Sequence, residues 1–342
     1  MRTTRGTTPR RNQNLGRLKA IIDDCVPSFV LTTSKVLTIA EPLFAETEGL
    51  TELEFLTVDL DQADTAARWQ APELSAETLA FLQYTSGSTG NPKGASYSHR
   101  QLVLHTLGLL AGFGAWPGNA GFHRSDVYMP LTPLFHVHGW GFPYAATMLG
   151  VRQVYPGRYD PEKILGLIAD ENVTFSHCVP TVLSMVLDHV NCPQTDLHRW
   201  KVIIGGAALP RNLQNRAAAA GISLHAAYGM SETCPFLTVA DLSSDDPEVQ
   251  AQTGFPGPLV DLRVVTPDMQ EVPHDGETTG EVVARAPWLT QGYLDNAQAS
   301  DELWDGGYLH TGDVGYIRGN GSLQITDRLK DVIKTGGEWI SS

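Results

Sequence analysis

The sequence predicts an α/β protein: a mostly parallel sheet with helices on both faces, followed by a smaller β-rich unit. Between residues 15 and 252, helical and strand patterns alternate, which is typical of right-handed βαβ units. A glycine- and hydroxyl-rich run, 84–94, directly follows one strand pattern. After about Gln252, short strands and tight turns replace this alternation.

The first predicted elements are one helix and three short strands, over 15–24, 28–32, 54–59 and 79–83. The last of these strands leads into the glycine-rich run. Ser98 and Gln101 have the spacing of a capping box, in which each side chain bonds the other residue's backbone amide. A helix is therefore expected from His99 to about Gly112, so that strand, loop and helix come in order.

The alternation continues from residue 160. Asp160 is suited to cap a helix and Pro161 to begin one, and Gly221 is suited to end one. The expected elements are a helix after Asp160, strand 173–178, helix 180–190, strand 201–204, helix 211–220 and strand 222–226. Because ligands of parallel sheets bind at the carboxyl ends of strands, Gly205-Gly206 and Tyr228-Gly229 are expected to share a crevice with the glycine-rich run.

The region after residue 252 is expected to form a small β-barrel-like subdomain. Gly319-Asn-Gly321 is typical of a hairpin turn. The predicted strands are 262–266, 280–285, 315–318 and 322–326.

Composition excludes some classes of protein. The chain has 24 Lys and Arg against 38 Asp and Glu, a net charge of −14, which argues against nucleic acid as a partner. No apolar run reaches the roughly 18–20 residues of a membrane span. Four cysteines without metal or disulfide spacing indicate reduced thiols in a cytoplasmic protein. The first 19 residues hold six basic and no acidic residues, typical of either a disordered arm or a transit segment.

The run 84–94 has the composition of a polyphosphate-binding loop. It contains three glycines, four Ser or Thr hydroxyls and Lys93. Glycines let the backbone amides approach a phosphate, the hydroxyls add donors, and the lysine adds a mobile positive charge. The common nucleotide pattern G-x-x-x-x-G-K-[ST] is absent, because Lys93 follows Pro92 and precedes Gly94.

Two further clusters carry groups that suit a nucleotide. In the run 228–233, Tyr228 could stack on a base, Ser231 or Thr233 could donate to a phosphate, and Glu232 could hold Mg²⁺. After His310-Thr-Gly, Asp313 suits ribose hydroxyls, and Arg328 could support the same sugar.

These motifs, in this order, resemble the adenylate-forming superfamily of acyl-CoA synthetases, luciferases and peptide-synthetase adenylation domains. The resemblance covers about 15–342 and is strongest to fatty acyl-CoA ligases. It implies ATP-dependent activation of a fatty or other apolar carboxylic acid to an acyl-adenylate, then transfer to the thiol of CoA. ATP, Mg²⁺ and CoA are the implied cofactors and co-substrate.

The resemblance also implies roles for single residues. The pyrophosphate end of ATP would be held by Thr85, Ser86, Gly87, Ser88, Thr89, Gly90 and Lys93. The adenine and acyl pocket would be lined by Gly206, Ala207 and Ala208, with Tyr228 on the adenine and Gly229 and Ser231 beside it. Glu232 would bind magnesium, Asp313 and Arg328 would hold the ribose, and Lys330 would be the hinge of a C-terminal lid. Thr85, Lys93, His138, Glu232 and Lys330 are the expected catalytic residues.

The segment 133–143 resembles the acyl site of fatty acyl-CoA ligases. His136 or His138 would lie near the carboxylate, Trp140 would gate the acyl tunnel, and Gly206 would contact the acyl group. The alternative is that these side chains only fill the core of an apolar helix.

The chain departs from the family at both ends. Family members continue past the hinge into a lid whose lysine contacts the reacting groups, whereas this sequence ends at Ser342. We expect an arm over 1–14, an α/β core over 15–252, a β-rich subdomain over 253–327, and a hinge with a truncated lid over 328–342. The chain is therefore expected to be impaired in activity, unless a partner supplies the lid.

Two alternatives stay open. The residues around Leu82 resemble fatty acyl-AMP ligases, which deliver to an acyl carrier protein instead of CoA. A non-catalytic protein that binds a nucleotide or acyl group is the second alternative, because a missing lid lysine lowers turnover and leaves binding.

Overall fold

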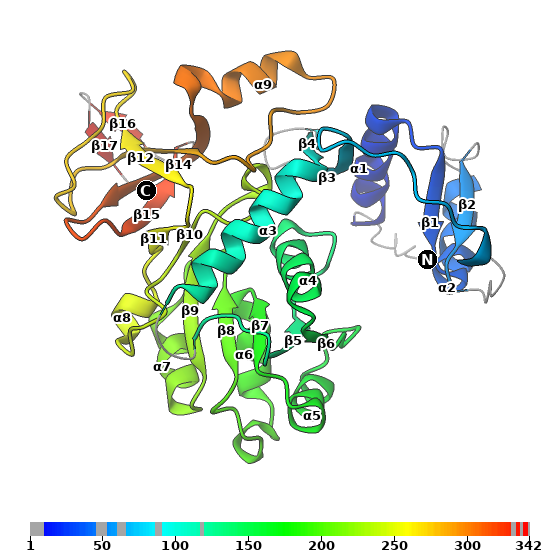
Figure 1. Ribbon diagram of the computed structural model, residues 1–342, viewed down its shortest axis with the longest axis horizontal. Helices are drawn as coiled ribbons and strands as arrows, with labels where there is room; N and C mark the ends of the chain where they lie inside the picture. Colours follow the sequence, from blue (N-terminus) through cyan, green and yellow to red (C-terminus); the bar gives the residue numbers. More distant parts are fainter. Residues whose placement is uncertain are drawn as a thin grey trace, which may run out of the picture.

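The fold is taken from a computed structural model that describes residues 10–45, 53–59, 66–85, 91–116, 120–329, 333–335 and 338–340 (Figure 1). A seven-stranded sheet is its centre. The strand order is β11-β10-β9-β8-β7-β5-β6, and β5 to β9 run parallel while β10 and β11 are antiparallel. The strands are β5 Val127–Pro130, β6 Arg152–Gln153, β7 Phe175–Cys178, β8 Lys201–Ile204, β9 Ser223–Tyr228, β10 Thr238–Val239 and β11 Phe255–Pro256. The predicted mostly parallel sheet is confirmed.

Helices cover both faces of this sheet. Successive strand residues point to opposite faces, so each strand contributes side chains to both helix layers. Ile203 of β8 packs in a cluster with side chains of α3 and α4, whereas Val202 and Ile204 pack with α5, α6 and α7. The helices are α3 His99–Gly114, α4 Val137–Leu149, α5 Pro161–Glu171, α6 Pro180–Asp188 and α7 Arg211–Ala219. Ser98 and Gln101 form the predicted capping box of α3, and Asp160 caps α5.

The glycine-rich run does not connect a strand of this sheet to a helix, as the sequence had suggested. It joins β3, Leu79–Tyr84, to β4, Gly94–Ser98, in a separate antiparallel hairpin, and α3 follows β4. Alternate residues of β4, Ala95 and Tyr97, are fully buried. This alternating burial and the hydrogen bonds to β3 make the segment a strand. The described ends of the motif, 84–85 and 91–94, therefore belong to a hairpin.

The second sheet is an open antiparallel meander in the order β12-β13-β14-β15. Its strands are β12 Asp261–Val265, β13 Gly280–Arg285, β14 Leu309–Ile317 and β15 Leu323–Arg328. The expected barrel-like closure is not found among the described strands. Leu323 of β15 exchanges backbone hydrogen bonds with Gly254 of the main body, so this edge pairs there and not with β12.

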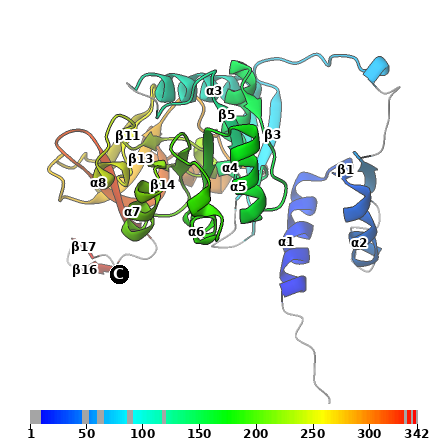
Figure 2. The same ribbon diagram turned by 90° about the horizontal axis from the view of Figure 1, so that it is seen from below.

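Further elements flank these two sheets. The N-terminal unit comprises α1 Arg10–Cys25, β1 Phe29–Thr32, α2 Ser34–Ala45 and β2 Glu54–Thr57. It lies at one side of the main body (Figure 2), and the Tyr84 hydroxyl donates to Asp24 at 2.6 Å. α1 begins five residues earlier than the predicted helix. The remaining elements are α8 Pro247–Gln250, α9 Ala297–Leu303, β16 Ile333–Thr335, β17 Glu338–Ile340 and 3₁₀ turns at Ala66–Arg68, Cys192–Gln194, Ser231–Thr233 and Asp305–Gly307.

A buried ion pair ties three neighbouring strands at one end of the sheet. Lys201, 8% exposed, donates to Asp126 at 2.8 Å and to the Gly121 carbonyl at 2.6 Å. The Thr174 hydroxyl donates to the other Asp126 oxygen at 2.7 Å. These bonds satisfy charges that would otherwise be costly to bury.

Within the described residues, no helix is long and apolar enough to cross a membrane.

Replacing Phe175 with Ala is expected to lower the free energy of unfolding by about 3–5 kcal/mol. Its ring is fully buried, with ring centroids of Phe122 and Phe142 at 4.6 and 5.0 Å, so truncation leaves a cavity. Urea denaturation measures the change. Phe135→Ala is the matched control, because Phe135 is 79% exposed and its truncation should cost less than about 0.5 kcal/mol. Equal losses in both variants would contradict this packing.

His105 is expected to make the protein acid-sensitive. It is fully buried between Trp140 and Trp288, and neither ring nitrogen has a hydrogen-bond partner among the described residues. Burial lowers its pKa from 6.5 to about 3. The unfolded chain therefore binds more protons than the native one between these values, and stability falls as the pH drops from 6.5 toward 3.

His105→Leu should reduce the loss of unfolding free energy between pH 7 and pH 5, measured in urea. His198→Leu, at a side chain 80% exposed, is the control for replacing a histidine with leucine outside the core. An unaltered pH dependence in His105→Leu would show that another group is responsible.

Candidate functional site

The glycine-rich loop is described at its base. The Thr85 amide donates to the Lys93 carbonyl at 3.0 Å, and the Lys93 amide donates to the Thr85 hydroxyl at 3.3 Å. These bonds close the loop and hold both expected catalytic residues at its mouth. The predicted phosphate-binding residues Ser86, Gly87, Ser88, Thr89 and Gly90 lie outside the described residues, as does the predicted hinge Lys330.

Lys93 and Glu232 both contact Tyr293, a residue that the sequence did not single out. The Tyr293 hydroxyl donates to Glu232 Oε1 at 2.7 Å, and Lys93 Nζ lies 5.0 Å from the centre of the Tyr293 ring. Glu232 is 6% exposed. Burial raises the pKa of this carboxyl, and the Tyr293 hydrogen bond and the Lys93 charge oppose that shift.

Tyr228 is hydrogen-bonded to Asp313, which also lies beside Arg328. The Tyr228 hydroxyl donates to Asp313 Oδ2 at 2.7 Å, and Arg328 Nε lies 3.5 Å from Asp313 Oδ1. Asp313 and Arg328 are register partners on β14 and β15, so the sheet itself places them together. Burial raises the pKa of Asp313, while the Tyr228 hydrogen bond and the Arg328 charge lower it. The predicted ribose pair is thus assembled in the structure.

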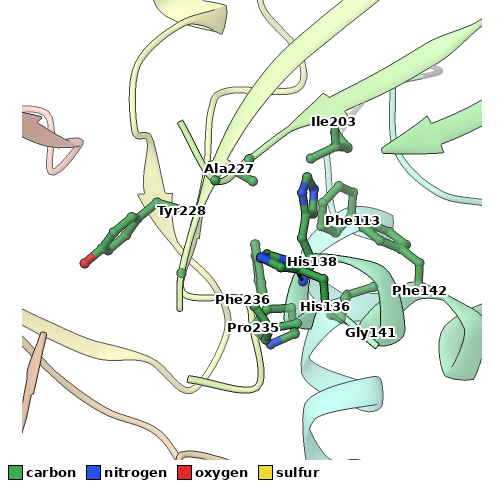
Figure 3. Close-up of a pocket in the computed structure, with 15 residues that line it drawn as sticks. Phe113, His136, His138, Gly141, Phe142, Ile203, Ala227, Tyr228, Pro235 and Phe236 are labelled. Atoms are coloured by element: carbon green, nitrogen blue, oxygen red, sulfur yellow. Dashed lines mark hydrogen bonds between the residues drawn. The ribbon is translucent and has the colours of Figure 1, made fainter. Parts of the chain in front are cut away.

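A mainly apolar cavity lies where β8 and β9 end (Figure 3). Its volume is about 80 Å³. Its lining combines the aromatic residues Phe113, Phe142 and Phe236 with Tyr228 and with glycine positions: Gly141, Gly205, Gly206 and Gly229 among others. Gly229 is required there, because a Cβ would lie 1.4 Å from the Pro235 carbonyl oxygen.

His136 and His138 both line this cavity, as predicted for the acyl site. The His136 side chain also caps α4 by accepting the His138 amide at 3.2 Å. Burial, reinforced by the neighbouring His136, lowers the pKa of His138 to about 4. His138 is therefore neutral at pH 7, and its buried Nδ1 has no hydrogen-bond partner in the described part of the chain.

Other predicted residues are less central. Trp140 does not belong to the cavity lining; it is 6% exposed and packs against Phe81 with ring centroids 4.7 Å apart. Ala207 and Ala208 follow β8 as exposed residues outside that lining. The Ser231 carbonyl accepts a hydrogen bond from the Tyr97 hydroxyl, which fixes the backbone just before Glu232.

The sequence analysis missed Tyr293 and the aromatic walls. Tyr293 follows Gly292 in a loop, where a Gly-Tyr pair is a weak signal. Phe113 and Phe142 have helical spacing and were indistinguishable from ordinary core residues.

The chain is similar to known proteins over most of its length. A family model described as "AMP-binding enzyme" matches residues 10–294. A long-chain-fatty-acid–CoA ligase of Thermus thermophilus is 40% identical over 287 residues, covering 80% of this chain and 51% of that relative. A 3-methylmercaptopropionyl-CoA ligase of Ruegeria pomeroyi is 35% identical over 331 residues, covering 91% and 58%. The chain therefore spans about half the length of these relatives.

Two solved structures share the fold. ATP-bound MatB of Rhodopseudomonas palustris superposes with a TM-score of 0.80 at 26% identity, covering 96% of this chain and 64% of that one. The inhibitor-bound N-terminal domain of FACL13 from Mycobacterium tuberculosis gives 0.79 at 24% identity, covering 92% and 77%. By the family match over most of its length, this chain belongs to the AMP-binding enzyme family.

Proposed function

We propose that this chain is the nucleotide- and acyl-binding part of an AMP-forming acyl-CoA ligase. The observation that carries the proposal is the position of Tyr228. This residue lines the apolar cavity, and its hydroxyl bonds Asp313, the carboxylate suited to a ribose. A nucleotide at Asp313 and an acid in the cavity would therefore be neighbours, as a reaction between them requires.

ATP would lie between the Asp313–Arg328 pair and the hairpin formed by β3 and β4. Asp313 and Arg328 would bind the ribose, and Lys93 with the loop that begins at Thr85 would hold the pyrophosphate end. The proposed adenine position is beside Tyr228, Gly206 and Gly229. Ala207 and Ala208, exposed after β8, would border it.

The residues present fit a nucleotide-bound Mg²⁺. Among the described residues, no cluster of three or more His, Cys, Asp or Glu could hold a metal alone, and Glu232 is a single buried carboxylate. Magnesium in nucleotide sites is bound by one or two carboxylates together with phosphate oxygens and water, which matches this donor set. When bound, the ion would neutralise charge on the phosphates, and Glu232 would anchor it.

Two steps would follow. A carboxylate oxygen of the acid attacks the α-phosphorus of ATP, the bond to the bridging oxygen of the β-phosphate breaks, and pyrophosphate leaves. The CoA sulfur then attacks the acyl carbon, the bond from that carbon to the AMP oxygen breaks, and the thiol proton passes to solvent. Lys93 would stabilise negative charge on the departing pyrophosphate. His138, held neutral by burial, would orient the carboxylate by a hydrogen bond.

The acid would be apolar, since aromatic rings form much of the cavity wall. Fatty acids and 3-methylmercaptopropionate, the acids in the relatives' names, are consistent with this. The volume of about 80 Å³ is roughly half of the about 150 Å³ cavity that admits benzene. A long chain would therefore require side chains of the wall to move, and Trp140, which lies on α4 and packs against Phe81, is our candidate gate.

CoA is the proposed acceptor, because the matched relatives are named as CoA ligases. Transfer to an acyl carrier protein is the alternative, and a lid domain in trans is a possible partner. The four free cysteines support a cytoplasmic location.

ATP–pyrophosphate exchange that depends on an apolar acid is the expected activity. A panel of straight-chain acids should be assayed with the chain alone and with a lid domain supplied as a second polypeptide. Calorimetry with ATP accompanies it. ATP binding without exchange in either assay would favour a binding-only protein, and no binding at all would refute both proposals.

Asp313→Asn should weaken ATP binding about 10- to 100-fold, because hydrogen bonds to a charged group contribute about 1.5–3 kcal/mol. The amide can still accept from Tyr228, so the fold should be retained. Asp301→Asn, at an exposed position of α9, is the matched control and should bind ATP normally. Calorimetric dissociation constants that are equal for both variants would place the ribose elsewhere.

A further inference from the structure

The segment Thr290–Leu294, between β13 and α9, connects the phosphate loop to Glu232. On one side it pairs with β4: the Leu294 amide donates to the Gly94 carbonyl at 2.9 Å, and the Ser96 amide donates to the Gly292 carbonyl at 3.1 Å. On the other side, the Thr290 amide donates to the Glu232 carbonyl at 3.1 Å. The segment therefore fixes the end of the loop relative to the carboxylate.

The position of Tyr293 within this segment is tightly determined. Its amide donates to the Ser300 hydroxyl at 2.9 Å. The preceding residue must be glycine, because a Cβ on Gly292 would lie 2.6 Å from the Ser300 hydroxyl oxygen. Thr290 is fully buried, and its hydroxyl donates to the Ser96 carbonyl at 2.9 Å. Contacts on both sides of the segment thus fix the direction in which the Tyr293 side chain points.

The Tyr293 side chain contacts both the Glu232 carboxylate and the Lys93 ammonium. Its hydroxyl donates a hydrogen bond to Glu232 Oε1, and the centre of its ring lies 5.0 Å from the Lys93 ammonium. Among the described residues, the side-chain hydrogen bond that this carboxylate accepts goes to Oε1, so Oε2 is the oxygen that would face a cation.

We infer that Tyr293 is a positioning residue for the metal–nucleotide complex, an inference that rests on the proposed function. It holds the Glu232 carboxylate with one oxygen turned toward the metal, and it keeps the Lys93 ammonium beside that carboxylate by a cation–π contact. A freely rotating carboxylate would lose entropy on metal binding, and the hydrogen bond removes much of this cost in advance.

The experiment measures ATP affinity by calorimetry with excess Mg²⁺ and with EDTA, and Mn²⁺ affinity in the presence of ATP by electron paramagnetic resonance. In Tyr293→Phe, the gain in ATP affinity on adding Mg²⁺ should fall about tenfold, the effect of one hydrogen bond to a charged group. The affinity in EDTA should stay within twofold, because the ring still faces Lys93. Tyr155→Phe, whose hydroxyl donates to Gln153 at a distant exposed site, is the matched control.

Two further variants separate positioning from a general structural effect. In a Glu232→Gln background, Tyr293→Phe should cause no additional loss of the Mg²⁺ gain, because the two changes act on one group. Tyr293→Leu should also weaken ATP binding in EDTA, because Lys93 loses the ring.

The outcomes are distinguishable. A normal Mg²⁺ gain and normal Mn²⁺ affinity in Tyr293→Phe would overturn the positioning role while leaving the proposed function intact. Equal losses with and without metal, together with a lower thermal midpoint, would make Tyr293 purely structural and would also overturn the inference. Failure of the unmodified chain to bind ATP would overturn both the proposed function and the inference.

Discussion

The burial of both faces of the parallel sheet is the constraint on which the candidate site depends. Because α3 and α4 cover one face and α5, α6 and α7 the other, the side chains of β8 alternate between two apolar clusters. A shift of β8 by one residue would exchange these faces, so its register is strongly determined. The same register brings the ends of β8 and β9 together, and the cavity lies there.

The proposed phosphate-binding residues are not on this sheet. Thr85 and Lys93 lie at the hairpin of β3 and β4, and the Thr290–Leu294 segment holds that hairpin to the backbone of Glu232. The proposed ribose pair, Asp313 and Arg328, comes from a third source, the register of β14 and β15. Three parts of the chain therefore meet at the candidate site, and hydrogen bonds of the Tyr228 and Tyr293 hydroxyls join them.

Much of the fold was predictable because its signals are local. Ser98 and Asp160 cap helices through residues three positions away, and Gly280–Arg285 is a strand with the predicted bounds. Tyr293 was not predictable, because its partner Glu232 is 61 residues distant in sequence. The hairpin strand β4 was missed for the same reason: its burial depends on the distant segment that pairs with it. The meander was expected to close as a barrel, and only tertiary pairing of Leu323 with Gly254 decides otherwise.

The shared position of Tyr228 has a thermodynamic consequence for the affinities of the two proposed substrates. Tyr228 lines the proposed acyl cavity and its hydroxyl orients Asp313, so the two proposed binding equilibria would be linked through this residue. Linkage is reciprocal: if a bound nucleotide favours the acid, a bound acid favours the nucleotide by the same factor. Selectivity for the acid and affinity for the nucleotide are then one coupled property of the chain, and evolution of either would alter the other.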